Sequence, residues 1–114
     1  VVEGGYVATL KLLSIDNPPT AIFAYNDLVA LGAMKAIREK NLLVSKDISV
    51  VGYDDIFLSA YLDPPLTTVS QPKYMMGKLA ADLLFRLING EKVKNSQISL
   101  KPELIIRSSC GVRV

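Results

Sequence analysis

The stretch that decides the fold is TAIFAYNDLVALGAMKAIREK, residues 20–40. Its first six residues form a short apolar run of the kind found in a strand that is buried on both faces. Asn26 and Asp27 come next, and both are residue types that cap the start of a helix. Residues 27–40 then place apolar side chains at helical spacing and gather cations near the end, where they suit the negative pole of a helix. The stretch therefore predicts a strand that runs directly into a helix.

The same alternation of strand and helix extends to both sides of this stretch. Prolines and a glycine mark the boundaries: Pro18 and Pro19 end the first helix, Pro72 suits the start of the last one, and Gly90 suits its end. The expected helices cover residues 5–15, 27–40, 56–62 and 72–89. The expected strands cover residues 20–25, 48–53 and 66–70, with two short segments inside residues 97–109 that Pro102 separates.

Strands that alternate with helices predict βαβ units, and hence an α/β fold with a parallel sheet flanked by helices. The 114 residues suffice for one domain at most. The chain opens on a helix with no strand before it, so we expect it to be part of a longer α/β domain.

The composition argues against several classes of function. The 13 basic and 11 acidic residues leave a net charge of +2 and are scattered, so the electrostatic footprint of direct nucleic-acid binding is absent. No apolar run approaches the roughly 18 residues of a membrane span, and we expect neither a membrane segment nor a signal peptide. The single cysteine, Cys110, excludes an internal disulfide and fits a reducing compartment. Histidine is absent, which removes the commonest general base and metal ligand.

Polar side chains follow three of the expected strands, at the point where each strand ends. They belong to Asn26, Asp27, Asp54, Asp55 and Gln71. In an open parallel sheet the ligand crevice lies outside the carboxyl ends of the strands. Amides and carboxylates can form several hydrogen bonds with the hydroxyls of a sugar or a similar polyol. The aromatic neighbours that could supply a flat apolar wall are Tyr25, Tyr53 and Phe57.

Plainer roles exist for the same residues. An Asn-Asp pair before a helix is most often a cap, and a lone Asp after a strand is commonly a turn residue. Gln71, which precedes a proline, can be ordinary loop. Asp54 and Asp55 are adjacent and need only one cap between them, which leaves one acid for a ligand.

Enzymatic chemistry finds little support in these residues. Without histidine, no Ser-His or Cys-His nucleophile system can be built, and no phosphate-binding loop or dinucleotide fingerprint is present. Asp27, Asp54 and Asp55 could gather a magnesium ion for phosphoryl transfer, but no lysine or threonine partner is placed beside them. We therefore expect no catalytic residue, no metal site and no cofactor.

Four segments in a fixed order carry a resemblance to a known family. They are PTAIFAYNDLVALGAMKAI, DISVVGYDD, PPLTTVSQP and ELIIRSS. Together they closely resemble the lac repressor/galactose repressor (LacI/GalR) family of bacterial transcription regulators, over residues 5–109. The resemblance implies a DNA-binding dimer with an N-terminal helix-turn-helix and a two-lobed effector module of the periplasmic-binding-protein-like type I fold. This chain is similar to the last third of that module.

The resemblance also implies how the chain divides between the two lobes. Residues 1–71 would be part of the C-terminal lobe of the effector-binding domain. Residues 72–101 would be the crossover helix and strand of the N-terminal lobe, and residues 102–114 the returning strand of the C-terminal lobe and the tail. The fold is then incomplete, and the apolar faces of helices 5–15 and 72–89 lack their usual cover. From this segment alone we expect a swapped or tightly packed oligomer.

In members of that family, the Asn of the AYND-like segment and the first Asp of GYDD contact the effector. The resemblance thus implies ligand contacts at Asn26 and Asp54, with Gln71 near the hinge as a conditional third. Asp27 and Asp55 are then left for capping. The dimer surface of relatives uses the helices after these two motifs, which implies partner contacts at Leu31, Leu58, Tyr61 and Leu62. The alternative is that these apolar residues belong to the subunit's own core.

The residues and the resemblance together predict the effector-sensing and dimerisation module of a cytoplasmic bacterial transcriptional regulator, a repressor. Its effector would be a saccharide or a similar small polar molecule, its partner a second copy, and its target operator DNA, reached through a helix-turn-helix outside this chain. It would be neither an enzyme nor a membrane protein. The alternatives are a periplasmic sugar-binding protein for transport, which shares the fold, and a magnesium-dependent phosphoryl-transfer domain.

Overall fold

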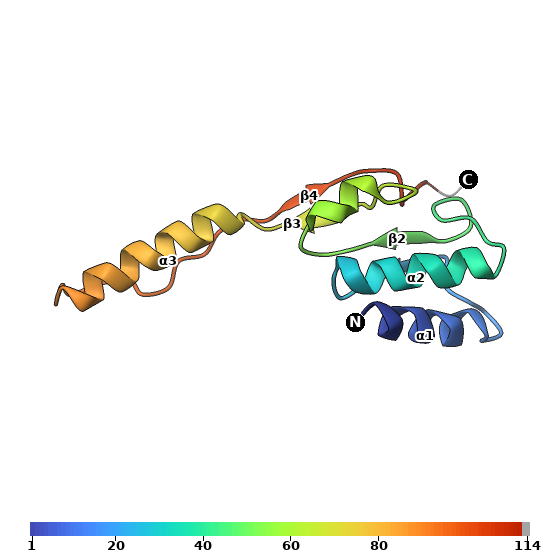
Figure 1. Ribbon diagram of the computed structural model, residues 1–114, viewed down its shortest axis with the longest axis horizontal. Coiled ribbons are helices and arrows are strands. Elements are labelled where there is room, and N and C mark those ends of the chain that lie inside the picture. Colours follow the sequence, from blue (N-terminus) through green and yellow to red (C-terminus); the bar gives the residue numbers. More distant parts are fainter. Residues whose placement is uncertain (113–114) are drawn as a thin grey trace. The chain divides into compact units, whose positions relative to one another are not determined.

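The computed structural model describes residues 1–112, and the chain forms two compact units in it. The first unit holds residues 1–70 and the segment from Leu104 onward, and the second unit holds residues 71–103 (Figure 1). The chain leaves the first unit after Ser70 and returns to it at Leu104.

The first unit contains helices and a parallel sheet, which confirms the predicted fold class. Before the chain leaves this unit at Ser70, its elements are α1 (Val2–Leu13), β1 (Ala21–Phe23), α2 (Asp27–Glu39), β2 (Ser49–Val51), the 3-10 helix η1 (Phe57–Tyr61) and β3 (Thr68–Ser70). Strands β1 and β2 run parallel, with Ile22 opposite Val50. Strand β4 (Glu103–Ile105) pairs with β3 after the return.

Two isolated parallel bridges join the β1–β2 pair to the β3–β4 pair. They connect Val51 with Thr67 and Asp54 with Ser70. Strands β1, β2 and β3 therefore run side by side in the same direction. Their carboxyl ends meet at one edge, which is the arrangement that a strand-end site needs.

Two predicted elements differ from the structure. Residues 56–62 form a single 3-10 helix of 5 residues rather than an α-helix, because Pro64 and Pro65 follow at once and leave no room for a longer element. Of the two strand segments expected on either side of Pro102, only the second forms, as β4. Residues 97–101 adopt no strand, since an apolar segment becomes a strand only where a neighbouring strand pairs with it.

The core of the first unit lies between α2 and the sheet. Met34, Ile37, Val50 and Leu66 are fully buried there and form one cluster with smaller neighbours. These four side chains come from α2, from β2 and from the entry to β3, so the apolar spacing of residues 27–40 is what positions the helix on the sheet.

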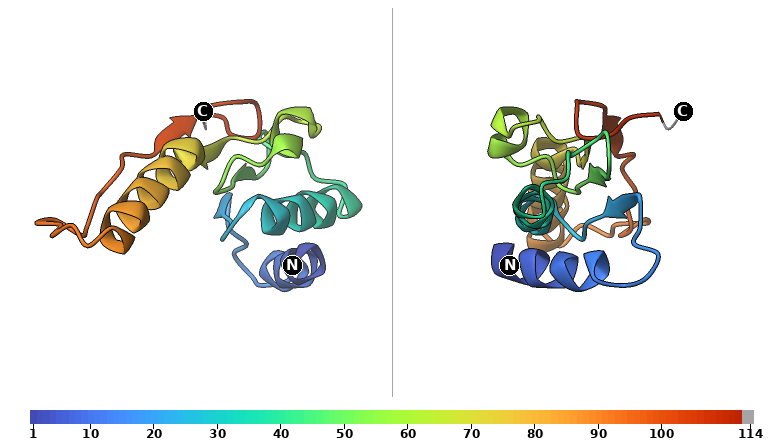
Figure 2. Two further views of the ribbon diagram at one scale, coloured as in Figure 1. Left: turned by 60° about the vertical axis from the view of Figure 1, so that its left-hand side comes forward. Right: turned by 90° about the vertical axis from the view of Figure 1, so that its right-hand side faces the viewer.

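Helix α1 packs on α2, and Figure 2 shows the two helices side by side. Glycines on both helices make this approach possible. A Cβ atom added at Gly5 would stand 2.2 Å from the carbonyl oxygen of Val29, and one added at Gly32 would stand 1.9 Å from that of Val2. The two backbones therefore touch where no side chain fits between them.

Strand β1 is not buried on both faces, contrary to the prediction from its apolar sequence. Ala24, at its end, is 3% exposed, but Phe23 is 69% exposed and Ala21 is also exposed. Helix α2 covers one side of the sheet. An apolar run shows that a strand is compatible with burial on both faces. Whether the second face is buried depends on another element that covers it.

The second unit consists of α3 (Lys73–Ile88) and the extended segment that runs back beside it (Figure 1). The predicted helix is confirmed, yet none of its residues is buried. Leu79 and Leu83 are half-buried and line a groove with Ile98 and Leu100. Within residues 1–112, no helix is both long enough and apolar enough to cross a membrane.

Candidate ligand-binding site

The ends of three strands are joined by backbone hydrogen bonds at the edge of the sheet. The N–H of Asp27 donates to the carbonyl of Tyr53 at 3.0 Å, and the N–H of Asp54 donates to the carbonyl of Val69 at 2.9 Å. The polar residues that follow β1 and β2 therefore lie close together, as the sequence predicted for strand ends. Asn26 and Asp54 each stand next to one of these bonds.

Asn26 is the N-terminal cap of α2. Its backbone is extended and its Oδ1 accepts from the N–H of Val29 at 2.9 Å, while the side chain stays half-buried. This bond fixes the side chain by the oxygen of its amide. The amide nitrogen carries two hydrogens that are chemically suited to donate to a ligand oxygen.

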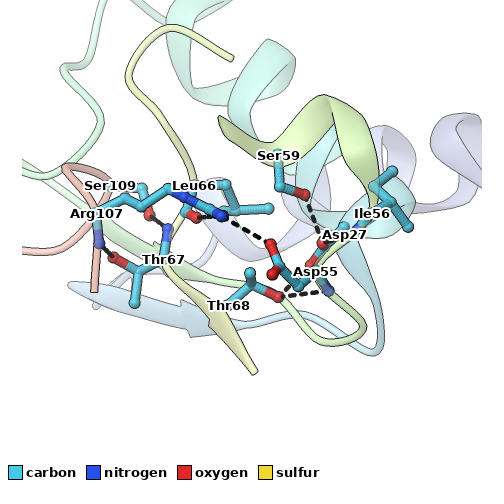
Figure 3. A network of polar contacts seen from close by, with 9 residues as sticks. All are labelled: Asp27, Asp55, Ile56, Ser59, Leu66, Thr67, Thr68, Arg107 and Ser109. Atoms are coloured by element: carbon cyan, nitrogen blue, oxygen red, sulfur yellow. Dashed lines mark hydrogen bonds and ion pairs between the residues drawn. The ribbon is translucent and has the colours of Figure 1, made fainter. Parts of the chain in front are cut away.

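Asp27 is a buried anchor and not a cap, which corrects the prediction made for it. It is 1% exposed, and its Oδ2 accepts from the hydroxyl of Ser59 and from the N–H of Ile56 at 2.9 Å. Its Oδ1 accepts from the hydroxyl of Thr68 (Figure 3). The carboxylate thus ties the start of α2 to η1 and to β3, and the neighbouring Gly52 leaves room for it, because a Cβ there would stand 2.1 Å from Oδ1.

Asp54 and Asp55 both have positive φ values, 112° and 55°. The value for Asp55 lies in the left-handed region that Asp tolerates, whereas that for Asp54 lies outside it. Such a conformation costs on the order of 1–3 kcal/mol and persists only where the surroundings hold it. Strained backbone of this kind is concentrated at ligand sites. The conformation of the half-buried Asp54 is therefore consistent with a ligand-binding role.

Asp55 forms an ion pair with Arg107, which corrects its expected role as a helix cap. The guanidinium Nη2 lies 2.8 Å from Oδ1 of Asp55, and the two side chains are only 20% and 21% exposed. Nη1 of Arg107 donates to the carbonyl of Leu66 at 2.9 Å (Figure 3). The cap position of η1 is Ile56, directly before Phe57, and no side chain forms a capping hydrogen bond there.

Sequence reasoning missed Arg107 and the inward role of Asp27. The one signal for Arg107 is a lone cation that directly follows the apolar residues 104–106. For Asp27, the partners Ser59 and Thr68 lie 32 and 41 residues away, and no local pattern connects them.

Of the three aromatic residues expected to line the site, Tyr53 is half-buried and the other two are exposed. Tyr25 is 86% exposed and Phe57 is 79% exposed. The ring of Phe57 packs against that of Tyr61, with centroids 5.1 Å apart, so it extends the surface of η1. Gln71 is half-buried and begins the second unit.

The four expected dimer contacts differ in exposure. Leu58 is 48% exposed and Tyr61 is 73% exposed, while Leu31 is half-buried. Leu62 packs against the core cluster, which matches the alternative that we kept for it. The apolar surface of η1 therefore consists of Phe57, Leu58 and Tyr61, and we refer to these three residues as the η1 patch.

The acids at the strand ends do not gather into a metal site. Asp27 points into the protein and Asp55 pairs with Arg107. In the part of the chain that the structure describes, no group of three His, Cys, Asp or Glu side chains could hold a metal ion.

Comparisons with known proteins identify the family of this fold. Residues 2–110 match the family of periplasmic binding protein-like domains. The chain is 46% identical over 112 residues to the HTH-type transcriptional repressor PurR of Pasteurella multocida, covering 98% of this chain and 34% of the relative. It is 40% identical over 107 residues to the ribose operon repressor of Haemophilus influenzae, covering 94% and 32%. The chain thus spans about a third of the length of the curated relatives it matches.

Solved structures agree with these relatives. A lac repressor dimer bound to operator and the anti-inducer ONPF is 41% identical and superimposes with a TM-score of 0.87. The match covers 96% of this chain and 38% of that one.

Proposed function

The chain belongs to the lac repressor/galactose repressor family, as a part of its periplasmic binding protein-like domain, and on this premise we propose that it senses a small polar effector and forms dimers within a bacterial transcriptional repressor. The observation that carries the proposal is the meeting of Asn26 and Asp54 at one sheet edge. The Asn26 amide is held by its bond to Val29, and the backbone that carries the half-buried Asp54 has a fixed, strained conformation before any ligand arrives. Fixed polar groups lose little conformational freedom on binding, which favours affinity.

The effector in this proposal is a saccharide or a similar molecule rich in hydroxyls. Asp54 would accept hydrogen bonds from ligand hydroxyls, and the amide nitrogen of Asn26 would donate to a ligand oxygen. A ribose operon repressor among the relatives and a lac repressor structure with ONPF favour this class. Gln71, Tyr25 and Phe57 remain proposed members of the site, and Gln71 is the first residue of the second unit.

We assign residues 1–71 and 102–114 to one lobe of a two-lobed effector-binding domain and residues 72–101 to the other. An effector shifts such a two-lobed protein only by binding one arrangement better than the other. Operator DNA would be bound by a helix-turn-helix outside these 114 residues, in the cytoplasm.

The dimer surface that we propose centres on the η1 patch and on Leu31. The patch is apolar and exposed, and Phe57 and Tyr61 are residue types that dominate the energy of protein interfaces. We assign no catalytic role to the site. The relatives reported above are repressors, which favours a regulator over a protein that carries sugars for transport.

Calorimetry on the natural full-length protein tests the proposal. The protein is titrated with a panel of pentoses and hexoses, with ONPF, and with nucleobases as the arm without sugar hydroxyls. The proposal is supported if at least one saccharide binds and if its presence changes the affinity for operator DNA in either direction. Binding of nucleobases alone contradicts the saccharide class, and binding of no member of the panel contradicts the sensing role.

A further inference from the structure

We propose that Arg107 is the positioning residue that holds the Asp54 carboxylate in place and links it to the two segments where the chain passes between its units. The inference rests on the proposed function and deepens it, because it states how the site could be regulated. Arg107 lies shortly after the return at Leu104, and Asp55 follows Asp54 directly.

Arg107 contacts two segments of the chain that lie far from it in the sequence. Its Nη2 binds Asp55, its Nη1 donates to the carbonyl of Leu66, and its backbone N–H donates to the hydroxyl of Thr67 at 2.9 Å. Leu66 and Thr67 lead into β3, the last strand before the chain leaves the first unit. One residue of the returning segment therefore contacts both the outgoing segment and the turn that carries Asp54 (Figure 3).

The backbone of that turn is held from both sides. Asp54 has a φ of 112°, which an L-residue keeps only when its neighbours are held on both sides. On the amino side, its N–H donates to the carbonyl of Val69 in β3. On the carboxyl side, Asp55 is held by the guanidinium of Arg107 at 2.8 Å.

One restraint comes from β3 and the other from the segment that follows β4. The chain leaves the first unit after β3 and returns to it at β4. A change of conformation in either segment that connects the units would be transmitted to the turn. It would act through the hydrogen bond from Asp54 to the carbonyl of Val69, or through the ion pair of Arg107 with Asp55. The Asp54 carboxylate would then move or loosen, and the affinity for the effector would change with it. Because such coupling is reciprocal, a ligand bound at Asp54 would in turn change the conformational preference of the two segments that connect the units.

A purely structural Arg107 would behave differently. Its loss would lower the stability of the whole first unit, while a folded variant would keep a normal turn and normal affinity. A positioning Arg107 would instead loosen the turn and weaken binding in a protein that is otherwise folded. The two cases differ in where hydrogen exchange rises.

The test compares Arg107→Met with Arg107→Lys, and uses Arg86→Met as the matched control. Arg86 forms an ion pair with Glu91 at 3.0 Å, but the pair is more than half exposed and lies in the second unit. In the ligand-free full-length protein, amide exchange in a peptide covering residues 53–56 should rise about tenfold in Arg107→Met, with little change in α1 and α2. Arg107→Lys keeps the charge but loses the two-pronged geometry, so it should fall between. Arg86→Met should match the wild type.

The second readout is affinity for D-ribose and ONPF by calorimetry, on variants shown to be folded at the assay temperature. Arg107→Met should weaken the bound probe about tenfold, and Arg86→Met should leave it unchanged. If Arg107→Met does not fold, Asp55→Asn is measured in its place, since it removes the same ion pair and keeps the shape of the side chain.

Wild-type exchange at residues 53–56 in a folded variant overturns the inference, and so does a rise that is equal across the whole first unit. If the wild type binds a probe and the folded variant binds it equally well, the inference fails and the proposed function stands. If the wild type binds no member of the full panel but the turn loosens as expected, the positioning role stands and the proposed function fails.

Discussion

The carboxylate of Asp27 accepts a hydrogen bond from the hydroxyl of Thr68, 41 residues further along the chain, at a site where both side chains are buried. The same carboxylate also accepts from Ser59 and from the backbone of Ile56. One acid therefore joins the helix after β1, the η1 helix and the last strand before the crossing. The predicted ligand edge and the η1 patch are built on the same anchor.

Replacing Asp27 with alanine should destabilise the protein by about 3 kcal/mol, because it leaves buried donors from Ser59, Thr68 and Ile56 without a partner. Urea denaturation followed by circular dichroism measures this. Asp82→Ala is the control, since Asp82 is exposed on α3, and it should change the stability by no more than about 0.5 kcal/mol. Equal stabilities for the two variants would show that the network contributes nothing.

Gly32→Ala should destabilise the protein by roughly 1–3 kcal/mol, because the new Cβ would meet the carbonyl oxygen of Val2 at 1.9 Å and force α1 and α2 apart. Gly4→Ala is the matched control, since nothing lies within 4 Å of its added Cβ. At the third residue of α1 that change should be neutral or stabilise by up to about 1 kcal/mol. Thermal melts of both variants decide the matter, and a Gly32→Ala protein as stable as the wild type would contradict the close contact.

The phenol of Tyr6 should titrate at higher pH than an ordinary tyrosine. It donates a hydrogen bond to Glu39, and that bond, with some desolvation and the negative charge of Glu39, raises its pKa. Because the pKa is raised in the folded state, the stabilisation is fully present below the ordinary value for tyrosine. It is lost as the pH rises through the higher folded value.

An ultraviolet absorbance titration, taken as the difference between the wild type and Tyr6→Phe, isolates this phenol. In Glu39→Gln the pKa of Tyr6 should fall back towards its ordinary value, since the carboxylate that accepts the phenol's hydrogen bond is removed, and its negative charge with it. A titration of Tyr6 that is identical in the wild type and in Glu39→Gln would be the contrary result.

Leu58→Asp should weaken the proposed dimer at least about tenfold, because it places a charge in the exposed apolar η1 patch. Sedimentation equilibrium on the full-length protein measures the dissociation constant. Leu43→Asp is the control, since Leu43 is 57% exposed and lies outside the patch. Dimers of equal strength in both variants would move the interface elsewhere.

The sequence was sufficient for the parts of the fold that depend on periodicity. The helix over residues 27–40 and the strand ends at Asn26 and Asp54 could be placed because their signals lie within a few residues. The same local rules named Asp27 as the cap, although Asn26 holds that position. When two adjacent residues are both of a capping type, the choice between them depends on the residue at which the helix begins. The sequence defines that start only to within a residue or two.

The remaining features depend on partners that are distant in the sequence. Arg107 pairs with Asp55 across 52 residues, and no local pattern brings them together. The strand expected at residues 97–101 failed for the related reason that pairing is decided by a neighbour and not by the segment itself. The exposure of Phe23 likewise depends on what covers the second face of the sheet.

The central claim is that the strand ends hold the effector, and the affinity of Asp54→Asn tests it most directly. Isothermal calorimetry compares the wild type, Asp54→Asn and the exposed control Asp16→Asn for the saccharide that binds best in the panel. Loss of one charge-assisted hydrogen bond should weaken Asp54→Asn by about tenfold to a hundredfold, with Asp16→Asn unchanged. An Asp54→Asn protein that is folded and binds the same saccharide as tightly as the wild type would contradict the claim.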